Sequence, residues 1–277
     1  MADVAANPAA RDAKTRSQSL SVSLQRRPNL IRAAAVILFF VLWEIFGRDM
    51  NPLFMTYPSA IAKAAWEVTV SGELLHATLA SAVPFLIGLF ISIFGGILIG
   101  VLIGQFWYFE YTLDPFINAL YAIPRIALVP LIMLWAGLET SGKVSILVSI
   151  AIFPVIINTY AGIKDVRGSL LEIGRAYCAT DTQLFLKIIL PAAVPYIMAG
   201  IRLCVGLAII GIVVAEFFTS ISGLGGMIIH YSNSFSTAKV FVPIIVIGIL
   251  GVAMTQAVMS IEKRLSRWRR LERERLG

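Results

Sequence analysis

Long apolar runs alternate with short polar segments along most of the chain. Six runs come close to the roughly 20 residues that a helix needs to cross a bilayer, and they predict spans at 30–46, 77–103, 116–137, 144–163, 194–219 and 240–261. Each span is expected to be helical, because a helix satisfies its own backbone hydrogen bonds in lipid. The pattern therefore predicts an all-α, polytopic membrane protein with about six transmembrane helices.

The apolar pattern also predicts how the chain is organised. Residues 1–28 lack apolar periodicity and are expected to form a mobile, basic cytoplasmic tail, and residues 29–75 hold the first span and an outer, periplasmic loop. Residues 76–262 are expected to form the membrane core, with short helices at 165–191, and residues 263–277 a second basic cytoplasmic tail. The first run is predicted to be a retained span, since no small-residue cleavage site follows it.

Charge placement supports this arrangement. The chain is 58% hydrophobic and 14% charged, with a net charge of +7, and its basic residues concentrate at the two ends and in the 164–193 loop. Because basic loops stay on the cytoplasmic side, both termini and this loop are predicted to be cytoplasmic. The loops at 47–76, 138–143 and 220–239 fall on the opposite side, and the loop near 104–115 falls on the cytoplasmic side without a basic residue. Basic residues beside hydrophobic runs indicate a lipid bilayer, and nucleic acid is not expected as a partner.

Small residues and prolines mark particular spans. Small side chains recur every four residues in the second span and predict a stripe along which another helix packs closely: Gly88, Ser92, Gly96, Gly100 and Gly104. Pro124 and Pro130 interrupt the third span, which indicates either a border of a transport pathway or a packed kink.

Several single polar residues leave two interpretations open. Trp135 and Asn158 are candidates for lining a pathway, but they also suit an interface anchor and an interhelical hydrogen bond. Glu216, near the outer end of the fifth span, is either functional or held by a helix–helix hydrogen bond. Glu44 and Arg48 are expected to pair with each other, and Arg202 is expected to reach the cytoplasmic surface or to brace the 165–191 helices.

The polar stretch from Lys164 to Pro191 predicts two short helices. Ser169 with Glu172, and Thr180 with Gln183, each have the spacing of a capping box that opens a helix. The first helix is expected to place four residues on one apolar face and to end near Cys178, and Pro191 is expected to disfavour helix at Leu190. The four residues of that face are Leu170, Ile173, Gly174 and Tyr177. Such helices suit either a protein partner or the membrane surface.

The same stretch resembles the coupling motif of ABC importer permeases, E-A-A-x3-G-x9-I-x-L-P. The spacing from Glu172 through Cys178 to Ile188-x-Leu190-Pro191 matches the motif, whereas Ile173 and Gly174 replace the two alanines and Cys178 replaces the glycine. The resemblance implies that this segment contacts an ATPase subunit through Glu172, Ile173, Gly174, Arg175, Ala176, Cys178, Ile188, Leu190 and Pro191.

The resemblance extends over about residues 80 to 265, to the nitrate, sulfonate and taurine branch of the binding-protein-dependent transport inner-membrane component family. It is carried by Ala122-Ile-Pro124, Ala127-Leu-Val-Pro130-Leu, Leu134-Trp-Ala-Gly137, Phe153-Pro154, Asn158-Thr159, Ala215-Glu216 and Gly223-Leu224-Gly225. It implies a type I ABC importer permease fold. The candidate pathway residues are Pro124, Pro130, Trp135, Asn158, Glu216, Gly223, Leu224 and Gly225.

The resemblance also implies partners and a role. These are a homodimer of this chain, two ATP-binding-cassette subunits that bind the ATP and magnesium, and a periplasmic solute-binding protein, all at the cell inner membrane. The chain itself is expected to hold no cofactor and to lack its own ATPase. Its solute is expected to be nitrate, a sulfonate, taurine or a similar small organic anion, carried as ATP binding draws the paired coupling helices together and reorients the spans.

Three other functions fit the sequence less well. Gly137-x4-Gly142-Lys143 has P-loop spacing, but Val144 stands where a magnesium-binding Ser or Thr belongs, so the segment is interpreted as a turn. No catalytic set or metal cluster is expected, and Cys178 and Cys204 form no disulfide pattern. An ion-gradient-driven secondary transporter is the alternative, which predicts ionisable residues at the membrane core and an internal repeat; the sequence indicates neither. A membrane scaffold without transport is the third possibility.

Overall fold

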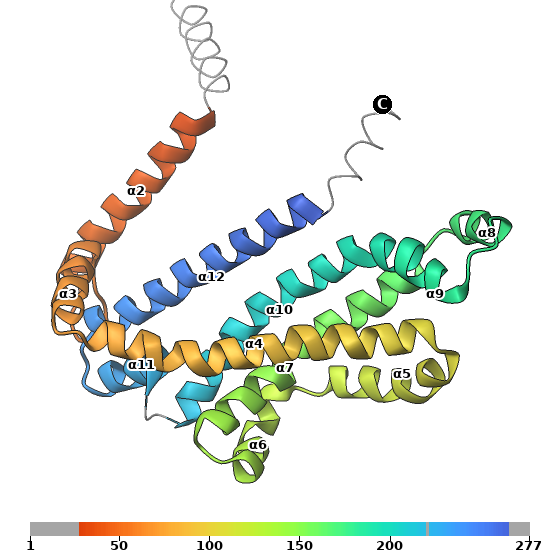
Figure 1. Cartoon of the computed structure of the whole chain (residues 1–277). Helices are drawn as coiled ribbons and strands as arrows, with labels where there is room; N and C mark the ends of the chain where they lie inside the picture. The colour runs from red at the N-terminus through yellow and green to blue at the C-terminus, as the bar shows by residue number, and fades with distance from the viewer. Residues whose placement is uncertain (1–27, 220–221, 266–277) are drawn as a thin grey trace, which may run out of the picture. The chain divides into compact units, whose positions relative to one another are not determined.

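The computed structural model describes residues 28–219 and 222–265, and within these ranges the chain is helical and has no strand (Figure 1). The predicted tails at 1–28 and 263–277 therefore lie almost wholly outside the described residues. Two short non-α turns, Arg125–Leu128 (3-10) and Phe185–Ile189 (π), interrupt the helices. The helices are α2 (Pro28–Asp49), α3 (Pro58–Val70), α4 (Glu73–Gln105), α5 (Trp107–Ala122), α6 (Val129–Ala136), α7 (Thr140–Lys164), α8 (Gly168–Ala176), α9 (Asp181–Leu184), α10 (Leu190–Thr219), α11 (Gly223–Asn233) and α12 (Thr237–Leu265).

The described helices confirm the expectation of about six spans. Five are long and apolar enough to cross a bilayer by themselves: α2, α4, α7, α12 and the continuous segment Asp181–Thr219 that ends in α10. The sixth consists of α5 and the Arg125–Ala136 segment, which meet at an angle of 90°. The fold class predicted from the apolar pattern is therefore correct.

The boundaries of the third span were predicted wrongly. The loop expected at 104–115 is helical except at Phe106, because α4 continues to Gln105 and α5 begins at Trp107. Pro124 lies at the sharp break, as its missing N–H requires. Pro130 instead lies in the first turn of α6, where no intrahelical donor is needed, so it starts a helix and does not kink one.

Two helices were missed because they are too short to span a membrane. In the region expected to be a 47–76 loop, α3 places Ile61, Ala64 and Val68 on one buried face at helical spacing. In the 220–239 region, α11 begins with Gly223, and its glycines give it a low intrinsic helix propensity. Short helices of this kind do not register in a search for long apolar runs.

The described residues divide into two packing units, with the boundary between Lys63 and Ala64. In the first unit Trp43 donates from Nε1 to the Thr56 carbonyl oxygen at 2.9 Å, which fixes the turn after α2. Arg48 and Glu44 form the predicted ion pair at 2.7 Å, and the same carboxylate accepts from Ser59. Most of the α2 surface is exposed and apolar, as suits a helix in lipid.

The second unit is built on the close parallel packing of α4 and α7. A Cβ placed on Gly88 would lie 2.8 Å from the Leu147 side chain, and one on Gly96 would lie 2.7 Å from Val155. At Gly100 it would lie 2.6 Å from Cβ of Thr159. The predicted stripe of small residues is therefore confirmed as a helix-packing surface.

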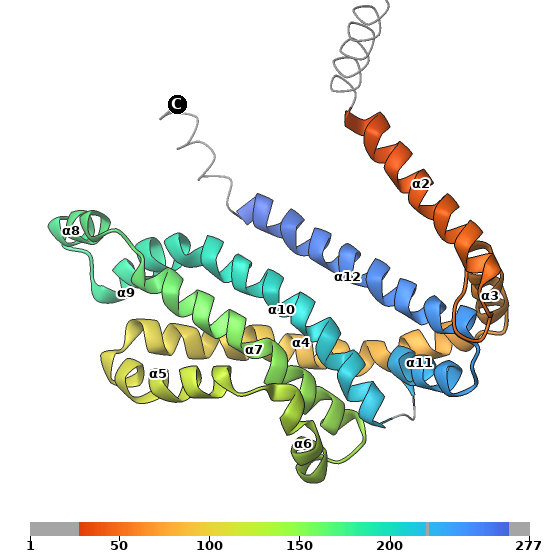
Figure 2. The same cartoon turned by 180° about the vertical axis from the view of Figure 1, so that it is seen from behind.

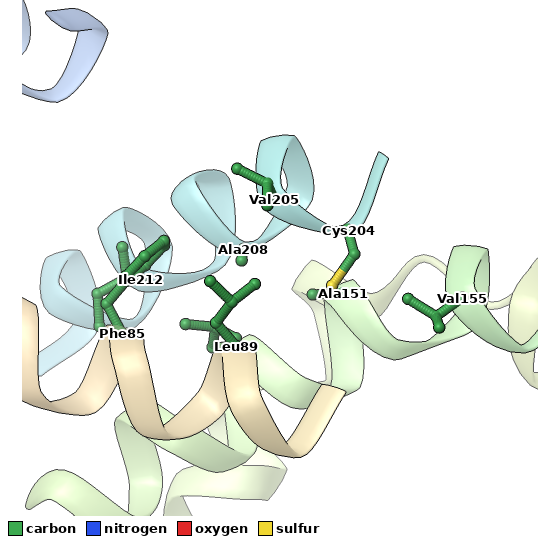
Figure 3. Packing of buried hydrophobic residues seen from close by; sticks show 9 residues of the cluster. Phe85, Leu89, Ala151, Val155, Cys204, Val205, Ala208 and Ile212 are labelled. Atoms are coloured by element: carbon green, nitrogen blue, oxygen red, sulfur yellow. The ribbon is translucent and has the colours of Figure 1, made fainter. Parts of the chain in front are cut away.

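Helix α10 runs antiparallel to α7 and completes the core. A Cβ on Gly200 would lie 2.9 Å from the Pro154 carbonyl oxygen, and one on Gly211 would lie 3.0 Å from Cα of Leu147. Both positions therefore suit glycine. Residues of α4, α7 and α10 then enclose one apolar cluster, shown in Figure 3: Phe85, Leu89, Ala151, Val155, Cys204, Val205, Ala208 and Ile212. These three helices are the rigid centre of the second unit.

Helix α12 is held to α10 by an ion pair within the membrane unit. Arg202 of α10 contacts Glu262 of α12 through its guanidinium group. A carboxylate near the C-terminal end of a neighbouring span therefore neutralises Arg202. That Arg202 reaches the cytoplasmic surface or braces the 165–191 helices stays a prediction.

Substituting Gly100 by alanine tests the packing of the core. The new Cβ would meet both Thr159 and the Ile156 carbonyl oxygen, and the backbone atom cannot rotate away. We expect G100A to cost about 1–3 kcal/mol and to lower the Tm in detergent by roughly 2–12 °C. The matched control is G206A on α10, where nothing lies within 4 Å. Equal Tm values for the two variants would contradict the close packing of α4 and α7.

Candidate functional site

The segment between α7 and α10 begins with an uncapped helix. The backbone of Arg167 forms the N-cap of α8, and no side chain caps it. The predicted capping box of Ser169 and Glu172 is wrong, because Ser169 already lies inside the helix and cannot take the extended backbone of an N-cap. The second predicted box is confirmed: Thr180 N donates to Gln183 Oε1 at 3.0 Å, and Gln183 N donates to Thr180 Oγ1 at 3.4 Å.

Cys178 ends α8 in a left-handed conformation, with φ of +55°. Its N–H donates to the Arg175 carbonyl oxygen at 2.9 Å, and the next N–H, of Ala179, donates to the Gly174 carbonyl oxygen at 3.1 Å. This pair of bonds is a Schellman motif, which normally has glycine at the left-handed residue. The geometry explains why glycine suits this position of the motif and shows that the cysteine here adopts the same turn.

Gly174 brings α8 against the start of the α10 segment. It is buried, and a Cβ at this position would overlap the Leu184 side chain and lie 2.8 Å from Ile188. The predicted face therefore divides, because Leu184 and Ile188 cover it at Gly174. The other three residues of that face are exposed: Leu170 by 42%, Ile173 by 55% and Tyr177 by 84%.

Helix continues through the position where a break was predicted. Leu190 is helical, and α9, the Phe185–Ile189 turn and α10 form one continuous helical segment. The turn is a π-helix in which Leu190 N–H donates to the Phe185 carbonyl oxygen. This wider turn accommodates Pro191, whose ring and missing N–H are incompatible with a regular α-helical turn.

The sequence-predicted coupling residues differ in where they lie and how exposed they are. Gly174 is buried and Ile188 half-buried, and their contact holds α8 to the segment that leads into α10. Leu190 is half-buried and packs against the cluster of Ile163, Ala193 and Ile197. Pro191 is exposed at the first turn of α10. The remaining residues are exposed on α8 and its terminal turn: Glu172, Ile173, Arg175, Ala176 and Cys178. With Leu170 and Tyr177, this exposed group is the α8 surface.

A polar cluster fixes the membrane helices at the same end of the bundle. Glu110 of α5 accepts from Tyr160 at 2.9 Å and from Lys164 at 2.5 Å, both on α7. Tyr196 of α10 donates to Asp165, the residue that follows α7. The α8 surface is thus attached to helices that are themselves tied together.

The last four candidate pathway residues come together where α10 meets α11. Helix α11 lies at the opposite end of the second unit from α8 (Figure 2). The Glu216 carboxylate is fully buried and accepts from Ser81 Oγ at 2.6 Å and from Gly225 N at 2.7 Å. Ser81 Oγ in turn accepts from Leu224 N at 2.8 Å. The helix–helix hydrogen bond expected as one interpretation of Glu216 is therefore present, and it connects α4, α10 and the N-terminus of α11.

Glycine is required where α11 meets this carboxylate. Gly223 has φ of +95°, and a Cβ on it would overlap the Glu216 carboxylate. A Cβ on Gly225 would lie 2.7 Å from Cβ of Glu216. Next to them, Lys143 Nζ donates to Ser222 Oγ at 2.9 Å from a buried position at the start of α7. Since Lys143 serves this contact and follows no strand in the described chain, the P-loop interpretation is excluded.

A cavity of about 230 Å³ lies beside this cluster and is lined by Glu73, His76, Gly223 and His230, among others. The Glu73 carboxylate accepts from the Tyr231 hydroxyl at 2.7 Å. Burial, reinforced by this carboxylate, raises the pKa of Tyr231 well above its usual value. The phenol therefore remains a hydrogen-bond donor at physiological pH.

The other pathway candidates are not brought into this cluster. Pro124 and Pro130 lie exposed at the break between α5 and α6, and Trp135 is 75% exposed. Asn158 donates to the Pro154 carbonyl oxygen at 2.8 Å within α7. Neither Trp135 nor Asn158 contacts the Glu216 cluster.

One charged residue at the break of the third span was missed. Arg125 lies between Pro124 and Ile126, inside the span predicted at 116–137. The expectation that ionisable residues are absent from the membrane core was therefore wrong. A lone arginine within a predicted span was an available signal, because such residues are rare in lipid and are usually functional.

Cys178 is exposed and Cys204 is buried, and both are free thiols. Across residues 28–219 and 222–265, no group of three or more His, Cys, Asp or Glu side chains is placed to hold a metal ion.

Comparison with known proteins gives concordant matches. The profile of the family described as "Binding-protein-dependent transport system inner membrane component" matches residues 92–270. The "Putative aliphatic sulfonates transport permease protein SsuC" of Bacillus subtilis (strain 168) is 35% identical over 82% of this chain and 83% of its own length. The "Formylaminopyrimidine transport permease protein ThiX" of Halalkalibacterium halodurans is 32% identical over 84% of this chain and 94% of its own.

More distant matches agree with these. The "Taurine transport system permease protein TauC" of Escherichia coli (strain K12) is 27% identical over 88% of this chain and 91% of its own. Among solved structures, a chain of an amino acid ABC transporter superposes with a TM-score of 0.56, covering 73% of this chain and 96% of its own, at 17% identity. At that identity the structural match supports the fold alone.

Replacing Cys178 by glycine tests the turn that ends α8. A side chain in the left-handed region costs roughly 1–2 kcal/mol, and glycine removes that cost. We expect C178G to slow amide hydrogen exchange at residues 174–180 by about fivefold or more. The control is C178A, which removes the thiol but keeps Cβ, and it should exchange like the wild type. Slowing by C178A as well, or by neither variant, would contradict a strained turn.

Proposed function

The chain belongs to the family of binding-protein-dependent transport system inner membrane components, and from this membership we propose that its α8 surface receives the movement of a separate ATPase subunit. As a member, it is a multi-pass transmembrane permease subunit of an ABC importer. This identity replaces the alternatives of an ion-driven carrier and of a scaffold.

One observation carries the coupling proposal, namely the pairing of an exposed α8 surface with a buried contact directly beneath it. Leu170, Ile173 and Tyr177 form an exposed apolar patch, which is typical of a surface that binds a protein partner. On the inner side Gly174 lets α8 lie directly against Leu184 and Ile188, on the segment that continues into α10. A push on α8 is therefore transmitted into a spanning helix.

The packing of the helices suits the transmission of a movement of α8 to the spans as one rigid body. The segment from Asp181 to Thr219 is one helical unit, and α10 packs against α7 along Gly200 and Gly211 with no side chain between the backbones. The bonds of Glu110 to Tyr160 and Lys164 add α5 to the same body. Displacement of α8 would thus move several spans together, as required of a two-state permease.

We propose that the functional assembly contains two copies of this chain, two ATP-binding-cassette subunits that hold the ATP and magnesium, and a periplasmic solute-binding protein. Family membership supports this composition, since the family is defined by transport that depends on a binding protein. On this assignment the membrane is the cell inner membrane, and α8 and both termini face the cytoplasm. The excess of basic residues at both chain ends supports that orientation.

We further propose a small organic anion as the solute, with sulfonates or taurine ahead of nitrate. Relatives at 35% and 27% identity are named as permeases for aliphatic sulfonates and taurine. Another relative is named for a formylaminopyrimidine, so the family as a whole does not fix the solute.

Replacing Glu172 by alanine tests the coupling role. Glu172 is exposed on the α8 surface, so its loss should leave the fold intact while removing a charged contact to the ATPase. We expect E172A in proteoliposomes with the ATPase subunits to lower ATP-dependent taurine uptake at least tenfold, roughly the effect of losing one charged hydrogen bond. E139A, which removes an exposed carboxylate just before α7, is the matched control and should transport normally.

Insertion and complex assembly are measured for both variants by size-exclusion chromatography. Full ATP-dependent uptake by an assembled E172A complex would contradict the assignment of α8. Loss of uptake with assembly intact would argue against a purely scaffolding role.

A further inference from the structure

Arg125 occupies the break between α5 and α6. The sequence there is Pro124-Arg125-Ile126, and α5 and the following segment meet at 90°. The guanidinium carbon lies 4.7 Å from the ring centre of Tyr121 and 4.6 Å from that of Phe153. Two aromatic rings from α5 and α7 therefore hold the guanidinium group in place.

This cation lies at mid-depth of the membrane unit. Phe153 is near the middle of α7, whose 25 residues extend about 37 Å at the usual helical rise. A guanidinium group in contact with Phe153 is thus far from both ends of the span. Neither end is within reach of an arginine side chain, so Arg125 cannot place its charge in the interfacial water.

No carboxylate neutralises Arg125 in the part of the chain that the structure describes. The four ion pairs found there involve Arg48, Lys164, Arg202 and Lys239. Arg202 makes the contrast clear, because that membrane arginine is paired with Glu262. Arg125 has aromatic partners and one backbone acceptor but no counter-ion.

The hydrogen-bond capacity of Arg125 is also largely unused. Of its five N–H groups, one on Nη2 donates to the Tyr121 carbonyl oxygen at 2.8 Å. Nε is buried and has no partner. The side chain is half-buried, and its neighbours Tyr121 and Ile126 are 48% and 55% exposed, so the site opens to the outside of the subunit.

We propose that Arg125 is a binding subsite for the anionic group of the solute as it passes through the membrane. A planar guanidinium with free donors matches a sulfonate or another small oxyanion, which accepts two parallel hydrogen bonds. Such an anion would supply the missing counter-charge, and the exposed neighbours Tyr121 and Ile126 leave the site accessible from outside the subunit. A lipid phosphate is not a suitable occupant, since lipid headgroups lie at the membrane surface and Arg125 lies at mid-depth.

This inference rests on the proposed function, because it names the part of the solute that the permease itself recognises. It deepens the solute assignment: selectivity for an anion would arise in the membrane chain as well as in the binding protein.

Two measurements on Arg125 variants test the subsite. In the first, methanesulfonate uptake is measured in proteoliposomes with the complete complex, together with ATP hydrolysis. In the second, the Tm of the purified full chain is measured with sodium methanesulfonate and with dimethyl sulfone, a neutral molecule of similar shape. R125Q removes the charge, R125K keeps the charge but loses the planar fork, and R48Q is a matched control that removes an exposed arginine.

We expect R125Q to lower uptake at least tenfold, the loss that one charged hydrogen bond produces, while ATP hydrolysis is unchanged. R125K should retain part of the uptake, and R48Q all of it. Methanesulfonate should raise the Tm of the wild type and of R48Q but not that of R125Q, and dimethyl sulfone should raise none.

Wild-type uptake and anion stabilisation in R125Q would overturn the subsite. If the wild-type complex does not carry methanesulfonate but the Tm increase still depends on Arg125, the proposed solute fails and the anion site stands. If uptake by R125Q is low and ATP hydrolysis falls equally, or if the anion raises the Tm of R125Q, Arg125 is a structural residue and the proposal is wrong.

Discussion

The close contact of α4, α7 and α10 is the constraint on which the rest of the membrane unit depends. In lipid there is no hydrophobic drive to bring helices together, so association relies on tight packing and on hydrogen bonds between helices. Gly96 and Gly100 on α4 and Gly200 on α10 allow backbone-to-side-chain contacts that any larger residue would prevent. The apolar cluster in Figure 3 forms only because these backbones come so close.

Polar contacts at the two ends of this core have different tasks. At one end the buried Glu216 carboxylate binds the N-terminus of α11 through Gly225, with Ser81 as a bridge to α4. Such a fully hydrogen-bonded buried group rigidifies its surroundings. At the other end the bonds of Glu110 join α5 to α7, and α8 rests on the helical segment that leads into α10. A force applied to α8 therefore acts on a body that resists internal deformation, and Arg125 lies at the 90° break between α5 and the segment that follows it.

The fold class could be predicted from the sequence because long apolar runs leave few alternatives to membrane helices. The glycine stripe was equally readable, since spacing by four residues defines one helix face. The broken third span, α3 and α11 could not be placed, because local patterns of ten residues or so do not distinguish a short helix from a loop. The prediction at Leu190 failed for a specific reason: a π-turn accommodates Pro191, and sequence spacing alone does not show how the backbone absorbs a proline.

The candidate site was predictable in its location but less so in its geometry. The motif spacing located the α8 segment, and the positive φ of Cys178 shows why a glycine is usual there. Only the structure shows that Gly174 is buried against Leu184 and Ile188 while Ile173 remains exposed. Arg125 was overlooked although its charge was visible, because its meaning depends on the missing counter-ion and on the depth set by Phe153.

The coupling role of α8 requires that α8 move when the ATPase subunits bind nucleotide. Cys178 is exposed on the α8 turn and Cys204 is buried, so a spin label on Cys178 in a C204A background reports on this turn alone. Pulsed electron paramagnetic resonance (double electron–electron resonance) on the reconstituted complex would give the distance between the spin labels on the two copies of the chain. We predict a shorter distance when a non-hydrolysable ATP analogue is added, and no such change when Glu172 is replaced by alanine. A distance that is the same with and without nucleotide would contradict this coupling role.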